Sequence, residues 1–488
     1  METISKQREV QNFIDGKFTK NGHKIMDVIS PRDGSIISTL PLSTYNDVDM
    51  AVKAAGLAFK EWSSKTLKDR VQVFFNYRTL LEKNMEELTK LVQLESGKTY
   101  GEAKAEVEKS MELCEFAVSL PQIVVNEIQE VSRGVECRIE RRPLGVVASI
   151  APFNFPNMVP NWTIPNALVL GNTMVIKPSE IVPLSTMRLA ELLKEAGLPD
   201  GVFNIVNGGK EVVEAICDHP DIKAVSFVGS TKVAKIVYKR ATSTLKRCVA
   251  LGGAKNHLLV LPDANPEMTA SNVVASMSGC AGQRCMAASV MVGIDKVEHI
   301  IDRMVDEAKK IIPGKNLGSV ISAEAKQRIE GYIAEAEADG AKILVDGRNT
   351  TVPGKEGGFY VGPTIIDHVK IDMSVAREEI FGPVISIIRA KDLDEAIEIE
   401  NGSDYGNAAA VFTQSGGLAK QVMERASAGM IGVNIGVPVP REPFSFGGWN
   451  ESKFGVGDIT GRSSIEFWTQ NKKTTTKWNP EAQTNWMS

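Results

Sequence analysis

Short apolar runs alternate with helical segments between residues 144 and 229, and this alternation restricts the possible folds more than any other feature. Each run has the length of a buried strand. The runs are "LGVVASIA" (144–151), "NTMVIK" (172–177), "VFNIV" (202–206) and "IKAVSFVG" (222–229). Strands that alternate with helices at this spacing form βαβ units on a parallel sheet.

Helices are predicted between and before these strands. One begins with Ser185 as its N-cap and ends just before Gly197, and another covers residues 210–218. Upstream, the spacing of apolar residues predicts a helix over 48–62 and one long helix over 68–95.

The second half of the chain also alternates apolar runs with helical segments. A further α/β stretch runs from about residue 255 to about residue 450. The closing segment "SSIEFWTQNKKTTTKW" (463–478) alternates, is polar, and predicts an edge strand that needs a partner. The terminal strand therefore favours a homo-oligomer, a dimer or a tetramer, over a monomer.

Bulk composition excludes several classes of function. A chain of 488 residues is too long for one core, so two or three domains are expected. The net charge of −4 gives no basic footprint for nucleic acid or an anionic membrane. No apolar run reaches the roughly 18 residues that span a bilayer. The polar start "METISKQREV" contains no secretory signal, which predicts a cytoplasmic protein.

The cysteines and histidines show no metal-binding spacing. The six cysteines include no C-x-x-C pair, and the five histidines form no H-x-x-x-H pattern. We therefore expect no metal site and no disulfide framework. Most of the cysteines are expected to be small buried residues.

Three loops follow predicted strands of the parallel sheet, where ligands bind in such folds. They are "IAPFNFP", "IKPSE" and "FVGST", and none contains G-x-G-x-x-G. Gly229 and Ser230 precede a predicted helix whose N-terminal N–H groups suit a pyrophosphate. Lys177 and Glu180 suit ribose hydroxyls. By themselves these loops are equally consistent with ordinary turns of an α/β core.

Two cysteines lie five residues apart in "GCAGQRCMAA" (279–288), and Arg284 directly precedes the second, Cys285. A metal ligand, a disulfide, a buried thiol and a nucleophile are all open from this segment alone. A single cysteine beside an arginine is more often structural than catalytic.

Seven motifs, taken in order, resemble those of the NAD(P)-dependent aldehyde dehydrogenases. They are "PFNFP", "KPSE", "FVGST", "LGGAK", "GQRC", "EEIFGPV" and "PFSFGG". The resemblance extends from "FIDGKF" (13–18) to the final strand. It implies an α/β fold with a Rossmann-type NAD-binding domain, an α/β catalytic domain and a small β oligomerisation domain. The implied boundaries are 1–122 with 144–253, then 254–450, and lastly 123–143 with 463–488.

The resemblance assigns the chemistry to Cys285 and Asn154. Cys285 matches the family's nucleophile, which forms a thiohemiacetal with the aldehyde and then a thioester after hydride transfer. The adjacent cation is expected to favour the thiolate. Asn154 is expected to donate its amide to the oxyanion together with the Cys285 backbone N–H. Cys280 matches no motif and is expected to serve packing.

The cofactor residues follow from the same motifs, and Glu180 is informative among them. Its carboxylate lies where a 2′-phosphate would lie, which favours NAD over NADP. The expected NAD-binding residues are Ala151, Phe153, Lys177, Glu180, Ser230, Gly252, Glu379 and Phe381.

Ala250 is a departure with mechanistic consequences. Hydrolytic members carry a glutamate at this place as general base on water, and a methyl group cannot accept a proton. Coenzyme A is a better acyl acceptor near neutral pH, because part of its thiol is already ionised. The CoA-acylating methylmalonate-semialdehyde dehydrogenases lack this glutamate and carry "GAKNH", present here at 253–257. We therefore expect coenzyme A to be a co-substrate.

Three cations are candidate ligands for an anionic aldehyde. Arg284 matches a carboxylate-binding arginine of that subfamily. Lys109 stands where the subfamily has a second arginine, and keeps the charge without the bidentate fork. Arg441 lies in "PVPREPFSF" (438–446), where the subfamily is usually apolar. Arg441 is alternatively paired with Glu442.

These residues predict oxidation of malonate or methylmalonate semialdehyde, with acyl transfer to coenzyme A and decarboxylation. Two alternatives stay open. One is a non-acylating dehydrogenase that releases a free acid from another anionic aldehyde, such as 3-sulfolactaldehyde or succinate semialdehyde. The other is a non-enzymatic binding protein, against which Cys285, Asn154 and Glu379 argue.

Overall fold

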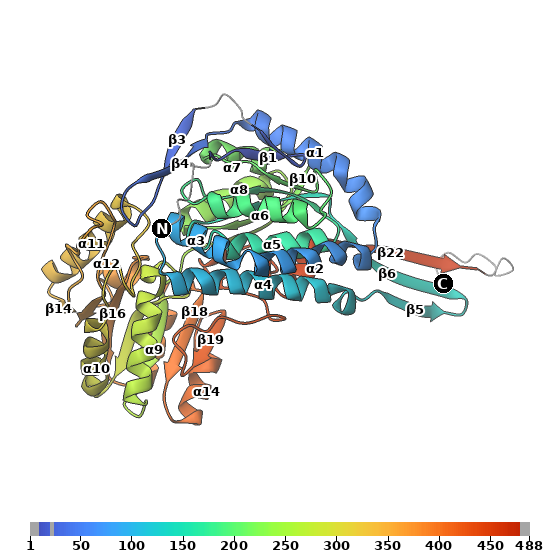
Figure 1. The fold of residues 1–488 in the computed structure, drawn as a ribbon. Helices are drawn as coiled ribbons and strands as arrows, with labels where there is room; N and C mark the ends of the chain where they lie inside the picture. Colours follow the sequence, from blue (N-terminus) through green and yellow to red (C-terminus); the bar gives the residue numbers. More distant parts are fainter. Residues whose placement is uncertain (1–8, 20–23, 479–488) are drawn as a thin grey trace.

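The computed structural model describes residues 9–19 and 24–478. These residues form two open α/β sheets and a narrow three-stranded sheet that projects from the body (Figure 1). The predicted α/β fold is confirmed. Residues 1–8, within the N-terminal segment predicted to carry no signal, and residues 479–488, within the predicted oligomerisation piece, lie outside the described residues.

The first sheet has eight strands in the order β2-β1-β9-β8-β7-β10-β11-β21. The five strands from β9 to β11 are parallel, and the edges are antiparallel. All four strands predicted between 144 and 229 are present, each slightly shorter than its apolar run. The bounds are β1 (Asn12–Ile14), β2 (Lys17–Thr19), β7 (Val146–Ile150), β8 (Thr173–Lys177), β9 (Phe203–Ile205), β10 (Ile222–Val228), β11 (Arg247–Leu251) and β21 (Lys453–Phe454).

Helices cover both faces of this sheet, because its strands are apolar on both sides. Three helices pack on one face: α1 (Tyr45–Ser64), α7 (Lys210–Asp218) and α8 (Thr231–Ser243). Five pack on the other face: α2 (Leu67–Lys83), α3 (Met85–Ser96), α4 (Tyr100–Ile123), α5 (Met158–Val169) and α6 (Leu184–Glu195).

Two details of the predicted helices are wrong. The long helix over 68–95 is two helices, because Asn84 leaves the helical conformation and its side chain caps the Leu80 carbonyl. Ser185 is not an N-cap and lies in the first turn of α6. The buried Glu95 carboxylate instead accepts the free backbone N–H groups of Leu184 and Ser185, at 2.7 and 2.9 Å.

The second sheet has seven strands in the order β14-β15-β16-β13-β12-β18-β19, parallel except for β14. The strands are β12 (Asn256–Val260), β13 (Ala288–Ile294), β14 (Lys342–Val345), β15 (Thr364–Asp367), β16 (Val384–Ala390), β18 (Ala408–Phe412) and β19 (Met430–Val433).

Helices also cover both faces of the second sheet. One face carries α9 (Pro266–Ser278) and α10 (Glu298–Lys309). The other face carries α11 (Ala323–Ala338), α12 (Ser374–Arg377), α13 (Leu393–Asn401) and α14 (Gly416–Arg425). Two short ladders complete the pairing: β3 (Ile25–Ile29) with β4 (Ile36–Pro41), and β17 (Tyr405–Gly406) with β20 (Trp449–Asn450).

The projecting sheet joins two segments that are far apart in the sequence. Its order is β22-β6-β5, with β5 (Glu127–Ser132), β6 (Val135–Pro143) and β22 (Thr469–Lys477). The strand predicted over 463–478 is correct only from Thr469. Residues before it form helix α15 (Ser463–Trp468), because Phe467 and Trp468 are buried in the core of the first sheet.

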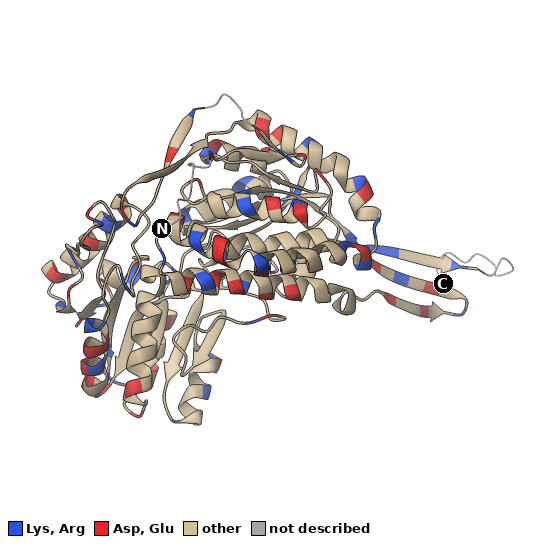
Figure 2. Cartoon of the chain, viewed as in Figure 1, with Lys and Arg blue, Asp and Glu red and all other residues tan. Residues whose placement is uncertain are grey.

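Basic and acidic residues are mixed along the helices and strands of the described part of the chain (Figure 2). Figure 2 shows basic and acidic residues interspersed along the helices and along the projecting strands, as expected from the net charge of −4. Among residues 9–19 and 24–478, no helix is long and apolar enough to cross a bilayer.

Candidate active site

The three loops singled out in the sequence meet at one edge of the first sheet. They follow β7, β8 and β10, which are adjacent parallel strands, so their carboxyl ends share an edge. A cavity of about 620 Å³ opens there, and we call it the loop cavity. A second cavity of about 530 Å³ lies between α4 and residues 435–446, and we call it the helix cavity. Cys285 lines both cavities.

The segment that carries Cys285 is held by the second sheet and by a facing loop. The Cys285 carbonyl accepts hydrogen bonds from the side chains of Asn256 and Asn407, each at 2.8 Å. Asn256 begins β12 and Asn407 precedes β18, so the second sheet fixes this backbone. Gly282 lies against the Gly382 carbonyl, where a Cβ atom would collide. Cys285 is thus fixed at the boundary between the two cavities.

The Cys285 thiol is not activated by its arginine alone. Burial and, to a smaller extent, the charge of Glu379 raise its pKa to about 12, although nearby backbone N–H groups and Arg284 oppose the shift. The adjacent cation favours the thiolate, as expected, but its effect on the pKa is smaller than that of burial. Desolvation outweighs the arginine, because a half-buried thiolate loses most of its hydration.

Asn154 lies where its amide reaches the cysteine segment. Its Nδ2 atom donates to the Gln283 carbonyl at 3.1 Å, two residues before Cys285, and the side chain lines the loop cavity. An amide nitrogen carries two N–H groups, so one is left for another acceptor. The structure thus brings the two predicted catalytic residues into one cluster.

Most of the predicted cofactor residues line the loop cavity, and two lie behind its wall. The Lys177 ammonium is buried and donates to Glu180 at 2.6 Å, so it orients that carboxylate. Ala151 is buried, and its backbone N–H donates to the Lys177 carbonyl. The lining residues are Phe153, Glu180, Ser230, Gly252, Glu379 and Phe381.

Glu379 and two aromatic rings form the wall of the loop cavity near Cys285. Phe153 and Phe381 meet edge to face, with ring centroids 5.7 Å apart. Glu379 accepts the Ala254 N–H at 2.9 Å. Burial raises the pKa of Glu379 to about 7, although the Ala254 N–H and Lys255 oppose the shift. This carboxyl therefore titrates near neutral pH.

Arg284 lies in the wall of the helix cavity without an acidic partner. One of its terminal nitrogens donates to the carbonyls of Ala275 and Ser276, at 2.8 and 2.9 Å. Its Nε atom is buried and has no hydrogen-bond partner. Within residues 9–19 and 24–478, no carboxylate forms an ion pair with Arg284. An unpaired guanidinium in a cavity is a site for an anion.

Lys109 and Arg441 are placed at the same cavity, but neither is free. The Lys109 ammonium donates to Glu442 at 2.7 Å and to Glu112 at 3.0 Å. Arg441 is 81% exposed and pairs with Glu112 at 3.8 Å, not with Glu442 as considered above. The two cations are compensated within the protein, which leaves Arg284 as the free cation of this set.

Ala250 contributes nothing polar to either cavity. It lies in β11 opposite Phe227, is fully buried, and packs among apolar side chains such as Val237. The lining of both cavities excludes it. The position that holds a carboxylate in hydrolytic relatives therefore presents only a buried methyl group.

Several residues of the site were missed by the sequence reasoning. Asn256 lies inside the quoted "GAKNH" stretch, so a signal existed. Lys98, Glu102 and Glu106 are also part of the cluster, and the spacing of the two glutamates places them on one helical face. That pattern also occurs on many solvent-exposed helices, so it did not distinguish them.

The chain belongs to the aldehyde dehydrogenase family, whose sequence profile matches residues 18–474. It is accordingly an enzyme that acts on aldehydes. Among curated relatives, malonate-semialdehyde dehydrogenase 2 of Bacillus thuringiensis (strain Al Hakam) is 44% identical over 485 residues, 98% of this chain and 99% of the relative. Malonate-semialdehyde dehydrogenase 1 of Geobacillus thermodenitrificans (strain NG80-2) is 43% identical over 96% of this chain and 99% of the relative.

Solved structures give the same family. The methylmalonate-semialdehyde dehydrogenase of Oceanimonas doudoroffii superimposes with a TM-score of 0.95 at 39% identity, over 97% of this chain and 99% of that one. A Sinorhizobium meliloti 1021 protein assigned to the methylmalonate-semialdehyde dehydrogenases, solved with NAD, gives 0.96 at 39% identity, with the same coverage.

Proposed function

We propose that this enzyme oxidises malonate or methylmalonate semialdehyde with NAD and transfers the acyl group to coenzyme A. The observation that carries the proposal is the position of Cys285 in a wall shared by two cavities. One cavity contains the expected cofactor residues, and the other contains the unpaired Arg284. Such an arrangement lets a nucleophile meet an aldehyde on one side and a hydride acceptor on the other.

The loop cavity fits NAD by the character of its residues. Ser230 precedes helix α8, of 13 residues, and its side chain makes no capping bond, so N–H groups of the first turn are available to a pyrophosphate. Glu180, oriented by Lys177, suits ribose hydroxyls and disfavours a 2′-phosphate. NAD, when bound, supplies the acceptor for the substrate hydride. We assign residues 1–122 and 144–253 to the cofactor domain and 254–450 to the catalytic domain.

The protein's own part of the reaction takes place at Cys285. The thiol loses its proton to solvent, and the sulfur forms a bond to the aldehyde carbon, which gives the oxyanion of a thiohemiacetal. Asn154 donates its free amide N–H to the oxyanion, together with the Cys285 backbone N–H. Loss of hydride from the same carbon leaves a thioester on Cys285.

Arg284 determines the preference for an anionic aldehyde in this proposal. A substrate carboxylate would accept from the guanidinium N–H groups that the Ala275 and Ser276 carbonyls leave free. In a malonyl thioester the thioester carbonyl is β to the carboxylate. Loss of CO₂ places the electron pair of the broken bond on that carbonyl, and a proton from solvent then gives an acetyl thioester.

Ala250 supports coenzyme A as acyl acceptor. The coenzyme A thiolate attacks the thioester carbon and releases the Cys285 sulfur, which needs no base at position 250. The names of the curated relatives agree with the substrate but do not specify the acceptor. We further propose that the projecting sheet of β5, β6 and β22 joins copies of the chain in a dimer or tetramer.

One observation favours a second candidate function. The pKa of Glu379 is raised to about 7 beside Cys285, which suits a general base on water. The enzyme would then release a free acid from an anionic aldehyde such as succinate semialdehyde or 3-sulfolactaldehyde.

A comparison of substrates tests the proposal. NADH formation is measured with malonate, methylmalonate and succinate semialdehydes, 3-sulfolactaldehyde and the neutral propanal, each with coenzyme A. We expect the highest kcat/KM for malonate or methylmalonate semialdehyde, by about 10-fold or more over the other anions. A preference for succinate semialdehyde, 3-sulfolactaldehyde or propanal would contradict the assignment.

A further inference from the structure

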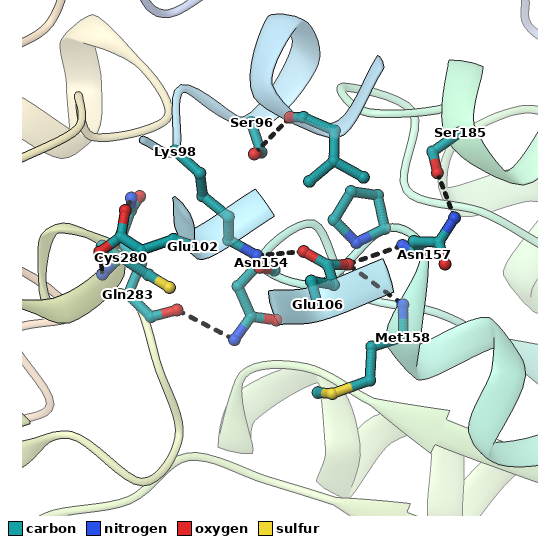
Figure 3. Close-up of polar contacts among 12 residues, drawn as sticks. Ser96, Lys98, Glu102, Glu106, Asn154, Asn157, Met158, Ser185, Cys280 and Gln283 are labelled. Carbon is teal, nitrogen blue, oxygen red and sulfur yellow. Dashed lines mark hydrogen bonds and ion pairs between the residues drawn. The ribbon is translucent and has the colours of Figure 1, made fainter. Parts of the chain in front are cut away.

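The first turns of α4 contact both reacting segments of the site (Figure 3). Lys98, just before the helix, forms an ion pair with Glu106, two turns into it. The two side chains are 4% and 0% exposed. A buried ion pair contributes little net stability, because each charge loses its hydration. We therefore ask which backbone segments of the site this ion pair positions.

The Lys98–Glu106 pair fixes the backbone that carries Asn154. The Lys98 ammonium donates to the Asn154 carbonyl at 2.6 Å. Glu106 accepts the backbone N–H groups of Asn157 and Met158 at 2.8 and 3.1 Å, where α5 begins. The segment is held at both ends, so the direction of the Asn154 amide is determined by this pair.

The same helix also holds the cysteine segment. One oxygen of Glu102 accepts the Thr99 N–H at the start of α4, and the other accepts the Cys280 N–H at 2.6 Å. Asn154 in turn donates to Gln283 in that segment. One rigid helix thus fixes the amide and the nucleophile relative to each other.

We propose that Lys98 and Glu106 are positioning residues for acylation, which act by aiming the Asn154 amide at the oxyanion formed on Cys285. The proposal rests on the role given to Asn154 in the proposed function. Lys98 lines neither cavity. Glu106 borders the helix cavity, but its carboxylate is bonded to Lys98 and to the backbone N–H groups at the start of α5, so both residues act through the segment that carries Asn154.

The variant that tests the pair is K98M/E106Q. It removes both charges together, so no uncompensated charge stays buried. The side-chain carbonyl that E106Q retains still accepts from the N-terminus of α5. Loss of alignment of the Asn154 amide should lower kcat by about 10- to 100-fold. KM for NAD should change by less than about 2-fold, because neither Lys98 nor Glu106 lines the loop cavity.

A double-mutant cycle with N154A separates positioning from a structural role. If the pair acts through Asn154, K98M/E106Q should lower kcat by less than about 2-fold in the N154A background. An equal loss in both backgrounds would overturn the proposal and leave the proposed function intact. Unchanged turnover in N154A alone would overturn the role of Asn154 and this proposal with it.

Alkylation of Cys285 by iodoacetamide in the absence of NAD is a second readout. It needs the thiolate but no oxyanion donor, so its rate and pH profile should stay within about 2-fold in K98M/E106Q. A parallel fall in alkylation and turnover would show general disruption and overturn the proposal. L88A is the matched control: Leu88 is fully buried in α3. It should lower the melting temperature yet leave kcat unchanged at a temperature well below the transition.

Discussion

The two cavities that share Cys285 are built in different ways. The loop cavity takes much of its lining from segments that directly follow strands β7, β8, β10 and β11, and the rest includes the cysteine segment and Glu379. The helix cavity is assembled from α4, the cysteine segment and residues 435–446, which are distant in sequence. In the loop cavity, local motifs place most of the expected cofactor residues. In the helix cavity, charges from segments that are distant in the sequence neutralise each other. Cofactor use is thus encoded locally, and substrate choice depends on which charges remain unpaired.

Removal of the shared nucleophile should have the largest effect. C285S should lower NADH formation by more than about 10³-fold, because a serine hydroxyl is far less ionised than a thiol. Quenching of Trp162 fluorescence, a residue that lines both cavities, reports NAD binding, whose Kd should stay within about 2-fold. Turnover above a tenth of wild type would contradict the role of Cys285 as the nucleophile.

Substitution of Arg284 should weaken binding of an anionic aldehyde in the helix cavity and leave NAD binding in the loop cavity unchanged. R284L should raise KM for malonate semialdehyde by about 10- to 100-fold, the value of a lost charged hydrogen bond. KM for propanal and for NAD should change by less than about 2-fold, since neither is bound by this guanidinium. The control R441L, at an exposed and acid-paired side chain, should change neither aldehyde KM. Equal effects of R284L on both aldehydes would refute an anion site.

Glu442 should limit the charge that the helix cavity accepts. E442Q removes one of the two carboxylates on Lys109 and should raise kcat/KM for a dianionic phosphonate aldehyde by about 5-fold. Propanal should be unaffected. Adding K109M to E442Q should abolish the gain, because the freed ammonium would be gone. A gain that survives K109M would show that Glu442 acts without Lys109.

Substitution of Glu379 should produce the smallest effect, a change in the reactivity of Cys285 in the enzyme without NAD. Its negative charge is the second cause, after burial, of the raised pKa of Cys285. E379Q should lower that pKa, so more thiolate exists at pH 8 and iodoacetamide alkylation should be about 3-fold faster. Above pH 7 the wild-type carboxyl is ionised, and the difference in alkylation rate between E379Q and the wild type should be largest. Below pH 7 this difference should shrink, because Glu379 is then protonated in the wild type. Slower alkylation in E379Q would contradict this coupling.

The contrast between the cavities also explains what could be predicted from the sequence. The parallel strands, and the assembly of Cys285, Asn154, Ser230 and Glu379 at one site, agree with the motifs, because each motif lies in a short segment beside a strand end. Asn154 and Ser230 follow β7 and β10, whereas Cys285 and Glu379 precede β13 and β16. The pairing of Lys109 could not be predicted, because its partner Glu442 is 333 residues away and no local pattern reveals that pair. The effect of burial on the pKa of Cys285 could not be predicted for a similar reason, since desolvation depends on the whole packed site.

The errors in the fold have the same origin. Ser185 is a good N-cap by type, but Glu95, from a different helix, already satisfies the N-terminus of α6. The segment before Thr469 alternates like a strand, yet burial of Trp468 against the first sheet makes it helical. In both cases a tertiary contact outweighs the local preference.

The most direct test of the central claim is NADH formation from malonate semialdehyde with and without coenzyme A, with the acyl product identified by mass. The account predicts that turnover requires coenzyme A and that acetyl-CoA is formed, because Ala250 offers no base to water. Equal rates without coenzyme A, with a free acid as product, would contradict it and assign the hydrolytic role to another group, Glu379 first.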